Sequence, residues 1–340
     1  MLSEEQLDEI REWLNKSQNP LFFFDNDADG LASFLLLRRY ICRGKGVAVK
    51  SFPELNSAYM SKVKEFKPDV VFILDKPLVS EEFLNEISLE NIPIIWIDHH
   101  PTQQSRGKAI YYNPLDNPPS TNEPIAYWCW KITKKDDWIA MIGCLGDWFI
   151  PDFAEKYSEE FPGLLDKRKS AAHALFETQT GKIVKILNFA LKDKTSNVVK
   201  MLRKLEDAKN PYEILEDKKF EQIRKRYEQV EKKYSALLEK AKELGMKGRR
   251  FIFFQYGGAL SLSSDISNEL YYIFPEKLIA VAYIKGDRAN LSIRGKGARD
   301  FIEKVLKEIQ GTGGGHELAV GANISVEDLP KFYEILKKHR

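Results

Sequence analysis

Three carboxylates stand within one short segment near the start of the chain and form its densest group of candidate metal ligands. The segment Asp25-Asn26-Asp27-Ala28-Asp29-Gly30 directly follows the apolar run 21–24. Carboxylates this close repel one another, so the arrangement is costly at a strand end unless cations compensate the charge. We interpret it as a divalent-metal site; an Asp-rich helix cap is the alternative, because Asp and Asn also cap helices. An EF-hand loop is excluded, since Leu36 stands where that loop needs a bidentate Glu.

Two adjacent histidines, His99 and His100, follow the apolar run 94–97 and Asp98. Neighbouring side chains of an extended segment point in opposite directions, so we expect one histidine to face a metal ion and the other a substrate. An ordinary loop is the alternative for such a pair taken alone.

Two further aspartates extend the set of candidate ligands. Asp75 ends the apolar run 70–74, and Asp147 follows a helical stretch that contains Gly143 and Gly146. Glycines in such a stretch permit close approach of a neighbouring backbone.

The apolar runs identify the elements that position these residues. Their uninterrupted hydrophobicity is typical of strands buried on both faces, as in a parallel α/β sheet. The expected strands are residues 21–24, 47–52, 70–74 and 94–97. Because ligands of an open parallel sheet gather beyond the carboxyl ends of its strands, Asp25, Asp75 and Asp98 should lie at one edge.

The segment from Phe153 to Leu244 is predicted to be helical and highly charged, without strands. Its last part has apolar residues at coiled-coil-like spacing: Phe220, Ile223, Tyr227, Val230, Tyr234, Leu237, Ala241 and Leu244. A connecting helix that packs this stripe on a neighbouring domain is one interpretation, and a seam for self-association is the other.

A second α/β unit is predicted after this helix. Strands are expected at 251–256, 278–284, 287–293 and 318–324, and helices at 298–310 and 328–338. The cluster 311–316 contains three consecutive glycines and His316, whose backbone N–H groups could form a phosphate-binding concavity; a flexible turn is the alternative.

Composition limits the classes of function. The formal net charge is only +2, from 52 Lys and Arg against 50 Asp and Glu, so bulk charge does not predict nucleic-acid binding and a polyanion needs a local patch. Arg294, Lys296 and Arg299 form such a patch, unless they line a solvated loop.

The chain also lacks signs of export or of a disulfide framework. Its longest apolar run, 278–284, is far shorter than the roughly 20 residues that span a bilayer, and it opens without a signal-peptide pattern. We expect a cytoplasmic protein without a membrane partner. Cys42, Cys129 and Cys144 are interpreted as three reduced core thiols.

The motifs together resemble a known family. The segment 25–30, Asp75, Asp98-His99-His100 and Gly146-Asp147 resemble, in order, the four motifs of the DHH phosphoesterases. The tail Gly313-Gly314-Gly315-His316 resembles the Gly-Gly-Gly-His signature of the DHH-associated C-terminal domain. Within the superfamily, nano-RNases, cyclic-dinucleotide phosphodiesterases and inorganic pyrophosphatases usually carry a His where this chain has Phe23. The pattern Asp25-x-Asp27-Ala28-Asp29-Gly30-x-x-Ser33 is instead similar to RecJ-type exonucleases, including archaeal relatives, with Asp25 as the natural substitute for that His.

The resemblance implies two divalent cations bridged by Asp75. One set of ligands would be Asp25, Asp27, Asp75 and Asp147, and the other Asp29, Asp75, His99 and Asp147. Carboxylates mixed with imidazole suit Mn²⁺, with Mg²⁺ as a weaker substitute, and two such ions activate water and clamp a phosphate. His100 would hydrogen-bond a phosphoryl oxygen, while Asp98 orients the loop.

The resemblance also implies the domain organisation. We expect a parallel-sheet DHH domain at 1–155, a helical connector at 156–247 and a smaller α/β DHH-associated domain at 248–340. In the family, the last domain faces the metal site across a narrow cleft and holds a nucleotide chain end. The residues that would do so are Ser292, Arg294, Gly313, Gly314, Gly315 and His316, with Lys296 and Arg299 as weaker candidates.

The function expected from the resemblance is a metal-dependent exonuclease that releases mononucleotides from single-stranded DNA, in the 3′→5′ direction, in repair or replication. RNA is left open as a substrate. A homo-oligomer and a repair helicase or replication protein are the expected protein partners. The alternatives are a nano-RNase or dinucleotide or pAp-type phosphatase, and a non-catalytic replication or repair scaffold, which would have lost metal ligands.

Overall fold

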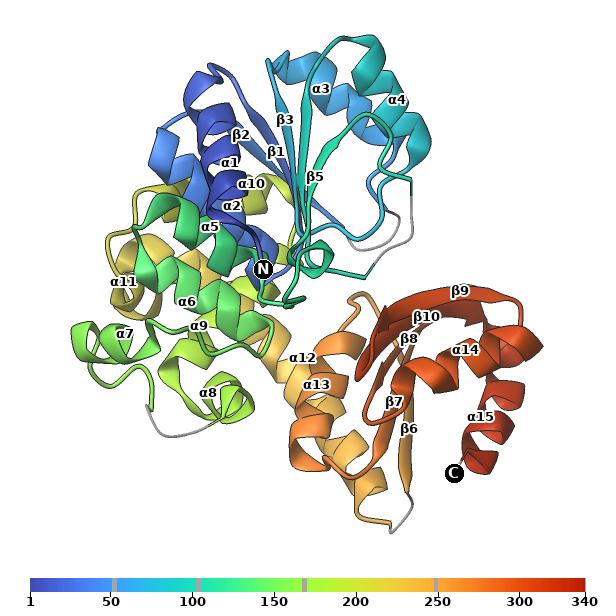
Figure 1. Ribbon diagram of the computed structural model, residues 1–340. Helices are drawn as coiled ribbons and strands as arrows, with labels where there is room; N and C mark the ends of the chain where they lie inside the picture. The colour runs from blue at the N-terminus through green and yellow to red at the C-terminus, as the bar shows by residue number, and fades with distance from the viewer. Residues whose placement is uncertain (51–53, 102–104, 167–169, 248–249, 340) are drawn as a thin grey trace. The chain divides into compact units, whose positions relative to one another are not determined.

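The computed structural model describes residues 1–50, 54–101, 105–166, 170–247 and 250–339. The chain forms two compact units, residues 1–227 and 228–340, and each is described by itself (Figure 1). The domain limits expected after residues 155 and 247 stay predictions, and residue 248 lies outside the described part. Among the described residues, no helix has the length and apolar character needed to cross a membrane.

The first unit is built on a sheet of five parallel strands in the order β2-β1-β3-β4-β5. The strands are β1 (Leu21–Asp25), β2 (Lys45–Val49), β3 (Val71–Leu74), β4 (Ile94–Ile97) and β5 (Ile110–Tyr112). The parallel sheet is therefore confirmed. Strand β2 begins before the expected 47, and residues 51 and 52 of that expectation lie outside the described part.

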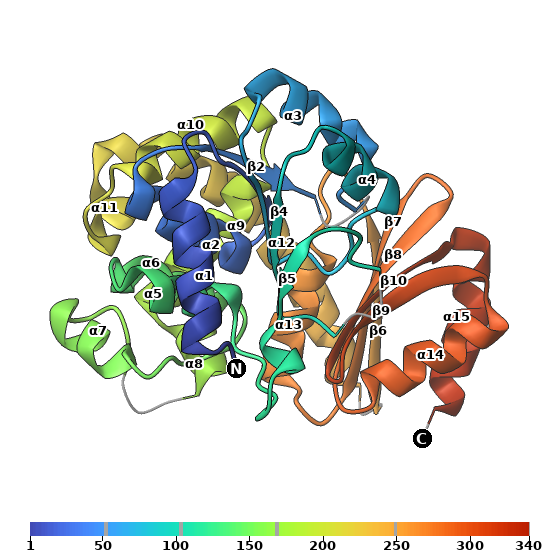
Figure 2. The ribbon, with the colours of Figure 1, turned by 45° about the horizontal axis from the view of Figure 1, so that its top comes forward.

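Helices cover both faces of this sheet (Figures 1 and 2). Phe22 and Phe24 belong to a core shared with α1 (Glu4–Lys16), α2 (Ala28–Ile41), α5 (Ile125–Thr133) and α6 (Asp137–Gly146). Phe23 belongs to the opposite core, with α3 (Met60–Phe66) and α4 (Glu81–Leu89). This burial on both faces is why the strands are uninterruptedly apolar.

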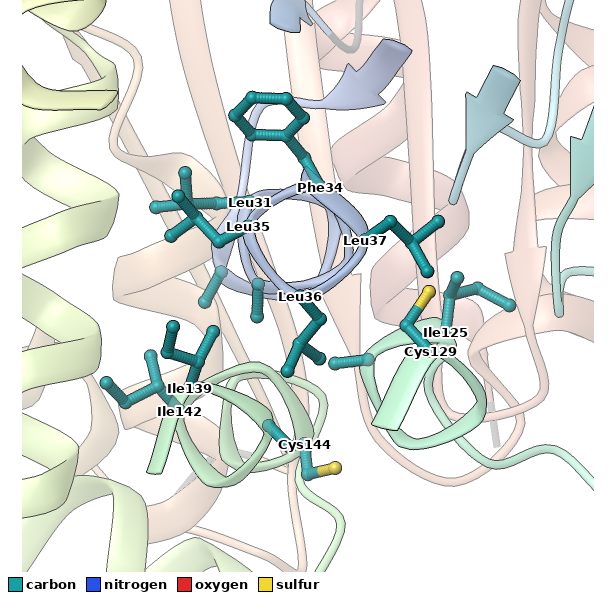
Figure 3. Packing of buried hydrophobic residues seen from close by; sticks show 14 of the residues in the cluster. Leu31, Phe34, Leu35, Leu36, Leu37, Ile125, Cys129, Ile139, Ile142 and Cys144 are labelled. Atoms are coloured by element: carbon teal, nitrogen blue, oxygen red, sulfur yellow. The ribbon is translucent and has the colours of Figure 1, made fainter. Parts of the chain in front are cut away.

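Side chains of α2, α5 and α6 pack together in the core (Figure 3). The helices approach closely because two glycines face neighbouring alanines. A Cβ added to Gly143 would lie 2.4 Å from Cβ of Ala126 and 2.6 Å from Cβ of Ala32. A Cβ on Gly146 would lie 2.7 Å from that of Ala28. The expectation of close approach at these glycines is confirmed.

The three cysteines are free thiols, as expected, but only two of them are buried. Cys129 and Cys144 lie in the core, whereas Cys42 is exposed at the C-terminal end of α2, which corrects the interpretation of three core thiols.

Helices follow from residue 154 onward, and the described residues of 153–244 contain no strand. They are α7 (Ala154–Glu160), α8 (Ala171–Glu177), α9 (Gln179–Leu191), α10 (Thr195–Glu206), α11 (Pro211–Glu216) and α12 (Glu221–Gly245). Short 3-10 turns occur at Ser57–Tyr59, Pro114–Asp116, Lys218–Phe220 and Val326–Asp328.

The apolar stripe of α12 is buried within the chain. Ile223 belongs to the core of the first unit, and Tyr234 donates a hydrogen bond to Glu269 of α13 (Ser263–Ile273) in the second. Leu238, rather than the expected Leu237, is the buried leucine. The stripe therefore gives no support to self-association.

The second unit has a mixed sheet in the order β6-β7-β8-β10-β9, in which only β6 and β7 run parallel. Its strands are β6 (Phe251–Gly257), β7 (Leu278–Lys285), β8 (Arg288–Arg294), β9 (Gly311–His316) and β10 (Ala319–Ser325), and its other helices are α14 (Ala298–Glu308) and α15 (Leu329–Lys338). The glycine cluster is thus an edge strand, so the alternative of a flexible turn is wrong, while phosphate binding by its backbone N–H groups stays a prediction. Pairing with β10 holds it extended.

Candidate metal centre

The carboxyl ends of three strands bring the predicted ligands of the first unit together. Asp25 ends β1, Asp75 follows β3, and Asp98 and His99 follow β4. Because these strands are parallel neighbours, their carboxyl ends meet at one edge of the sheet. The start of α2 adds Asp27 and Asp29, and the end of α6 adds Asp147.

The turn from β1 into α2 both caps a helix and presents carboxylates. Asp27 is the N-cap of α2, and its Oδ1 accepts a hydrogen bond from the N–H of Gly30 at 3.0 Å. A Cβ at Gly30 would lie 2.4 Å from the carbonyl oxygen of Asp25, so only glycine fits this turn. Burial, and then the charges of Asp25 and Asp147, raise the pKa of Asp27 to about 7.

Asp29 is fully buried and is fixed by the N-terminus of α5. It accepts hydrogen bonds from the N–H groups of Ile125 at 2.8 Å and Ala126 at 2.7 Å. The amides and dipole at a helix N-terminus favour an anion. Burial and the charge of Asp147 nevertheless raise its pKa well above the usual range.

His99 joins two of the carboxylates. Its Nε2 lies 3.3 Å from Oδ1 of Asp75 and 3.3 Å from Oδ2 of Asp147. Atoms of Asp29, His99 and Asp147 that could bind a metal all lie within 4.8 Å of one another. Burial and the charges of Asp29 and Asp27 raise the pKa of Asp75. Burial alone would lower the pKa of His99, but Asp147 and Asp75 outweigh it and raise that pKa. The centre is thus short of positive charge.

His100 lies beside this group and pairs with Asp98. The ring Nδ1 lies 2.9 Å from Oδ1 of Asp98 and 3.7 Å from Oδ1 of Asp75. Burial would raise the pKa of Asp98, but His100 and His99 together outweigh burial and lower that pKa. Tyr111 donates to Asp98 as well, and Asn113 donates to the carbonyl of His100. His99 thus lies between Asp75 and Asp147, whereas the nearest carboxylate of His100 is Asp98. The expected division of the two histidines between a metal ion and a substrate stays a prediction.

A lysine that the sequence analysis missed lies inside the centre. Nζ of Lys76 lies 2.9 Å from Oδ1 of Asp25, and the two side chains are only 2% and 13% exposed. Burial opposes the charge of Lys76, but Asp25, and then Asp75 and Asp27, raise its pKa. Lys76 directly follows Asp75 but belongs to no spaced motif, so only its contacts identify it.

The two ligand sets implied by the resemblance differ in how well they fit a divalent cation. Asp29, Asp75, His99 and Asp147 supply oxygen and imidazole donors from four segments, a mixture that suits Mn²⁺. Asp25, Asp27 and Asp75 also lie within bonding range of a shared ion, but this group already contains the ammonium of Lys76.

The predicted substrate residues of the second unit lie in register across three strands. Ala319 of β10 pairs with Arg294 of β8 on one side and with His316 of β9 on the other. Two residues along β10, Gly321 lies between Ser292 and Gly314. The sheet thus aligns residues that the sequence places in separate segments.

Helix α13, which the sequence analysis missed, supports these side chains. Ser292 donates to the hydroxyl of Ser263 at 2.9 Å, and Nε of Arg294 donates to Oδ1 of Asn268 at 2.6 Å. Burial lowers the pKa of Arg294 to about 10. Of the weaker candidates, Lys296 is exposed, and Arg299 pairs with Glu303 at 3.2 Å.

Comparisons with known proteins agree with this architecture. Residues 255–339 match the family described as DHHA1 domain. RecJ of Thermus thermophilus, solved in complex with Mn²⁺, matches 98% of this chain with a TM-score of 0.71 at 14% identity. The chain has the DHH fold followed by a DHHA1 domain. It spans about half of that RecJ, covering 54% of its length.

Two further structures share the DHH fold. Exonuclease RecJ bound to manganese matches 99% of this chain and 94% of its own, with a TM-score of 0.65 at 14% identity. PggH of Vibrio cholerae, a pGpG-specific phosphodiesterase, matches 94% of this chain and 98% of its own, with a TM-score of 0.52 at 16% identity. None of the curated proteins compared matches the chain by sequence.

Proposed function

We propose that the chain is a divalent-cation-dependent exonuclease that hydrolyses single-stranded DNA. The observation that carries the proposal is the convergence of Asp29, Asp75, His99 and Asp147 beside a second histidine, His100, which Asp98 orients. The DHH fold is found in RecJ exonucleases and in a phosphodiesterase. Loss of metal ligands, which a non-catalytic scaffold predicts, is not seen among these residues.

The residues of the centre have separate tasks in this hydrolysis. A bound divalent cation, for which Mn²⁺ is the best match, polarises a phosphate and makes water more acidic. Asp98, ionised because its pKa is low, holds Nδ1 of His100 and so favours a proton on that atom. The other ring nitrogen, Nε2, is then the atom that faces the phosphoryl oxygen, to which it donates when the ring is charged.

The DHHA1 domain supplies groups for a nucleotide chain end. Arg294 and His316 flank Ala319 at equivalent positions of β8 and β9, and Asn268 fixes the guanidinium of Arg294. Guanidinium and imidazole groups bind phosphate oxygens. Binding of one strand end by these groups supports an exonuclease, for which we propose 3′→5′ polarity and a role in repair or replication.

The test is a time course on single-stranded DNA and RNA of some twenty nucleotides, labelled at the 5′ or the 3′ end, with Mn²⁺. We expect DNA to shorten steadily from the 3′ end with release of mononucleotides. Loss of label first from the 5′ end would reverse the polarity, and absence of cleavage with Mn²⁺ or Mg²⁺ would contradict the proposal.

A second candidate is a phosphodiesterase for very short oligonucleotides or dinucleotides. The similarity to PggH over 94% of the chain favours it. The same time course with pGpG as an added substrate separates the two, because this enzyme would cleave pGpG and leave the longer strand intact.

A further inference from the structure

We propose that the ammonium group of Lys76 takes the place of one of the two cations implied by the family resemblance, so that the centre binds a single divalent ion. That ion belongs to Asp29, Asp75, His99 and Asp147. The inference rests on the proposed function only in requiring a divalent-cation centre; it does not depend on the substrate.

The position of the ammonium supports this substitution. Oxygens of Asp25, Asp27 and Asp75 lie within 4.8 Å of one another, as ligands of a shared cation would. Nζ of Lys76 bonds to Asp25 at 2.9 Å, and its charge also acts on Asp75 and Asp27. A divalent ion among the same three carboxylates would lie close to a buried positive charge, where repulsion is weakly screened.

Lys76 is also firmly placed. Its side chain is 2% exposed, and its carbonyl accepts a hydrogen bond from Nε1 of Trp96 at 2.9 Å. Moving the ammonium away would leave the carboxylate of Asp25 buried without its ion pair, which is strongly unfavourable. Oδ1 of Asp25 also accepts from the N–H of Asn26, and Oδ1 of Asp27 from that of Gly30. The carboxylates of Asp25 and Asp27 therefore already accept hydrogen bonds from groups of the chain itself.

The remaining ligand set has a different character. His99 is the basic residue that bonds to Asp75 and Asp147, and an imidazole that loses its proton becomes a metal ligand itself. A lysine cannot be a metal ligand while its ammonium group is charged, because that group has no lone pair to donate. The carboxylate of Asp25 is thus paired with an ammonium group, which cannot bind a metal ion, whereas Asp75 and Asp147 are paired with an imidazole, which can.

The number of bound ions tests the proposal without measuring activity. Metal-free protein is titrated with Mn²⁺ by calorimetry, and free Mn²⁺ is followed by electron paramagnetic resonance. We expect one ion per chain in the wild type and in Lys76→Arg, and two in Lys76→Met. Lys62→Met, which removes an exposed lysine paired with Glu65, is the control and should bind one.

A charge-neutral double variant covers the case in which Lys76→Met does not fold. Asp25→Asn with Lys76→Met removes the ion pair, and the protein should still bind one ion within about threefold of the wild-type affinity, whereas Asp29→Asn should lose about 100-fold. Two ions of similar affinity in the wild type, one ion in a folded Lys76→Met, or a large loss in the double variant would overturn the proposal. Two ions with an active nuclease would contradict this inference alone, while no bound ion would contradict the proposed function as well.

Discussion

The carboxylate of Asp98 holds His100 at two points. Its Oδ1 lies 2.9 Å from the ring Nδ1, and its Oδ2 accepts a hydrogen bond from the backbone N–H of His100 at 3.2 Å. Because Asp98 is fully buried, this pairing fixes both the ring and the chain that carries it before any substrate binds.

Asp98→Asn should therefore lower kcat of the proposed nuclease by about 10- to 100-fold, the usual cost of losing such a support. KM and the amount of bound Mn²⁺ should change little, since Asp98 is not in the proposed ligand set. Steady-state kinetics on a labelled oligonucleotide and metal analysis check this. Tyr111→Phe is the milder control, because it keeps the carboxylate of Asp98 and removes a 3.3 Å contact to it together with the acceptor of a 2.9 Å hydrogen bond from Asn113. An Asp98→Asn enzyme with wild-type kcat would refute the positioning role.

Asp75→Asn should abolish both Mn²⁺ binding and nuclease activity, because Asp75 lies in both ligand sets. In EDTA the same change should leave the free energy of unfolding equal or higher. It removes a buried carboxyl group that is costly to ionise, as the raised pKa of Asp75 indicates. Urea unfolding with and without Mn²⁺ measures both effects: the loss of stabilisation by the metal ion and the unchanged or higher stability in EDTA. Glu5→Gln, on the exposed face of α1, should change neither quantity, and full activity of Asp75→Asn would exclude the proposed centre.

The metal-free protein should lose stability as the pH rises from 5 to 7. Asp27 has its pKa raised from 3.8 to about 7 by burial, Asp25 and Asp147. A raised pKa means that the folded chain holds the proton more tightly, so this stabilisation is complete below the unfolded value and is lost as pH approaches the folded one.

Thermal unfolding at a series of pH values measures how Tm of the metal-free protein changes with pH. Because Mn²⁺ needs ionised ligands, its stabilising effect on Tm should be larger at about pH 7.5 than at about pH 5. Asp27→Asn should flatten the metal-free slope. A metal-free Tm that rises over the same pH range would show that the buried carboxylates do not dominate.

Gly143→Ala should destabilise the first unit by about 1–3 kcal/mol, the usual cost of overpacking. The added Cβ would lie 2.4 Å from Cβ of Ala126, so α5 and α6 would have to separate. Urea unfolding followed by tryptophan fluorescence gives the value. Gly314→Ala is the control, since its Cβ would meet nothing within 4 Å; equal stability of the two variants would contradict the close packing.

The sequence predicted the edge of the first sheet well because its strands are buried on both faces. Uninterrupted apolar runs show where β1, β3 and β4 end, and the chemically active residues stand directly after those ends. Strand β5 escaped prediction because it is short and its first residue, Ile110, is exposed.

Long-range pairing accounts for what the sequence did not predict. Glycine disfavours strands, so no strand was predicted at the cluster 311–316, but pairing with β10 makes it an edge strand. Lys76 and Asn268 belong to no spaced motif, and their importance depends on partners, Asp25 and Arg294, that folding brings near. Such isolated residues are recognised only from their contacts.

The glycines that allow close packing around α2 help to classify related sequences. Gly30, Gly143 and Gly146 are required by close packing against backbone and alanine neighbours. Asp75 and His99 are instead required by the proposed metal binding and hydrolysis. A sequence that retains all three glycines but has lost Asp75 or His99 would keep the scaffold without its reaction. Comparing these two sets of positions separately in related sequences would therefore distinguish relatives that have kept only the fold from relatives that have kept the catalytic activity.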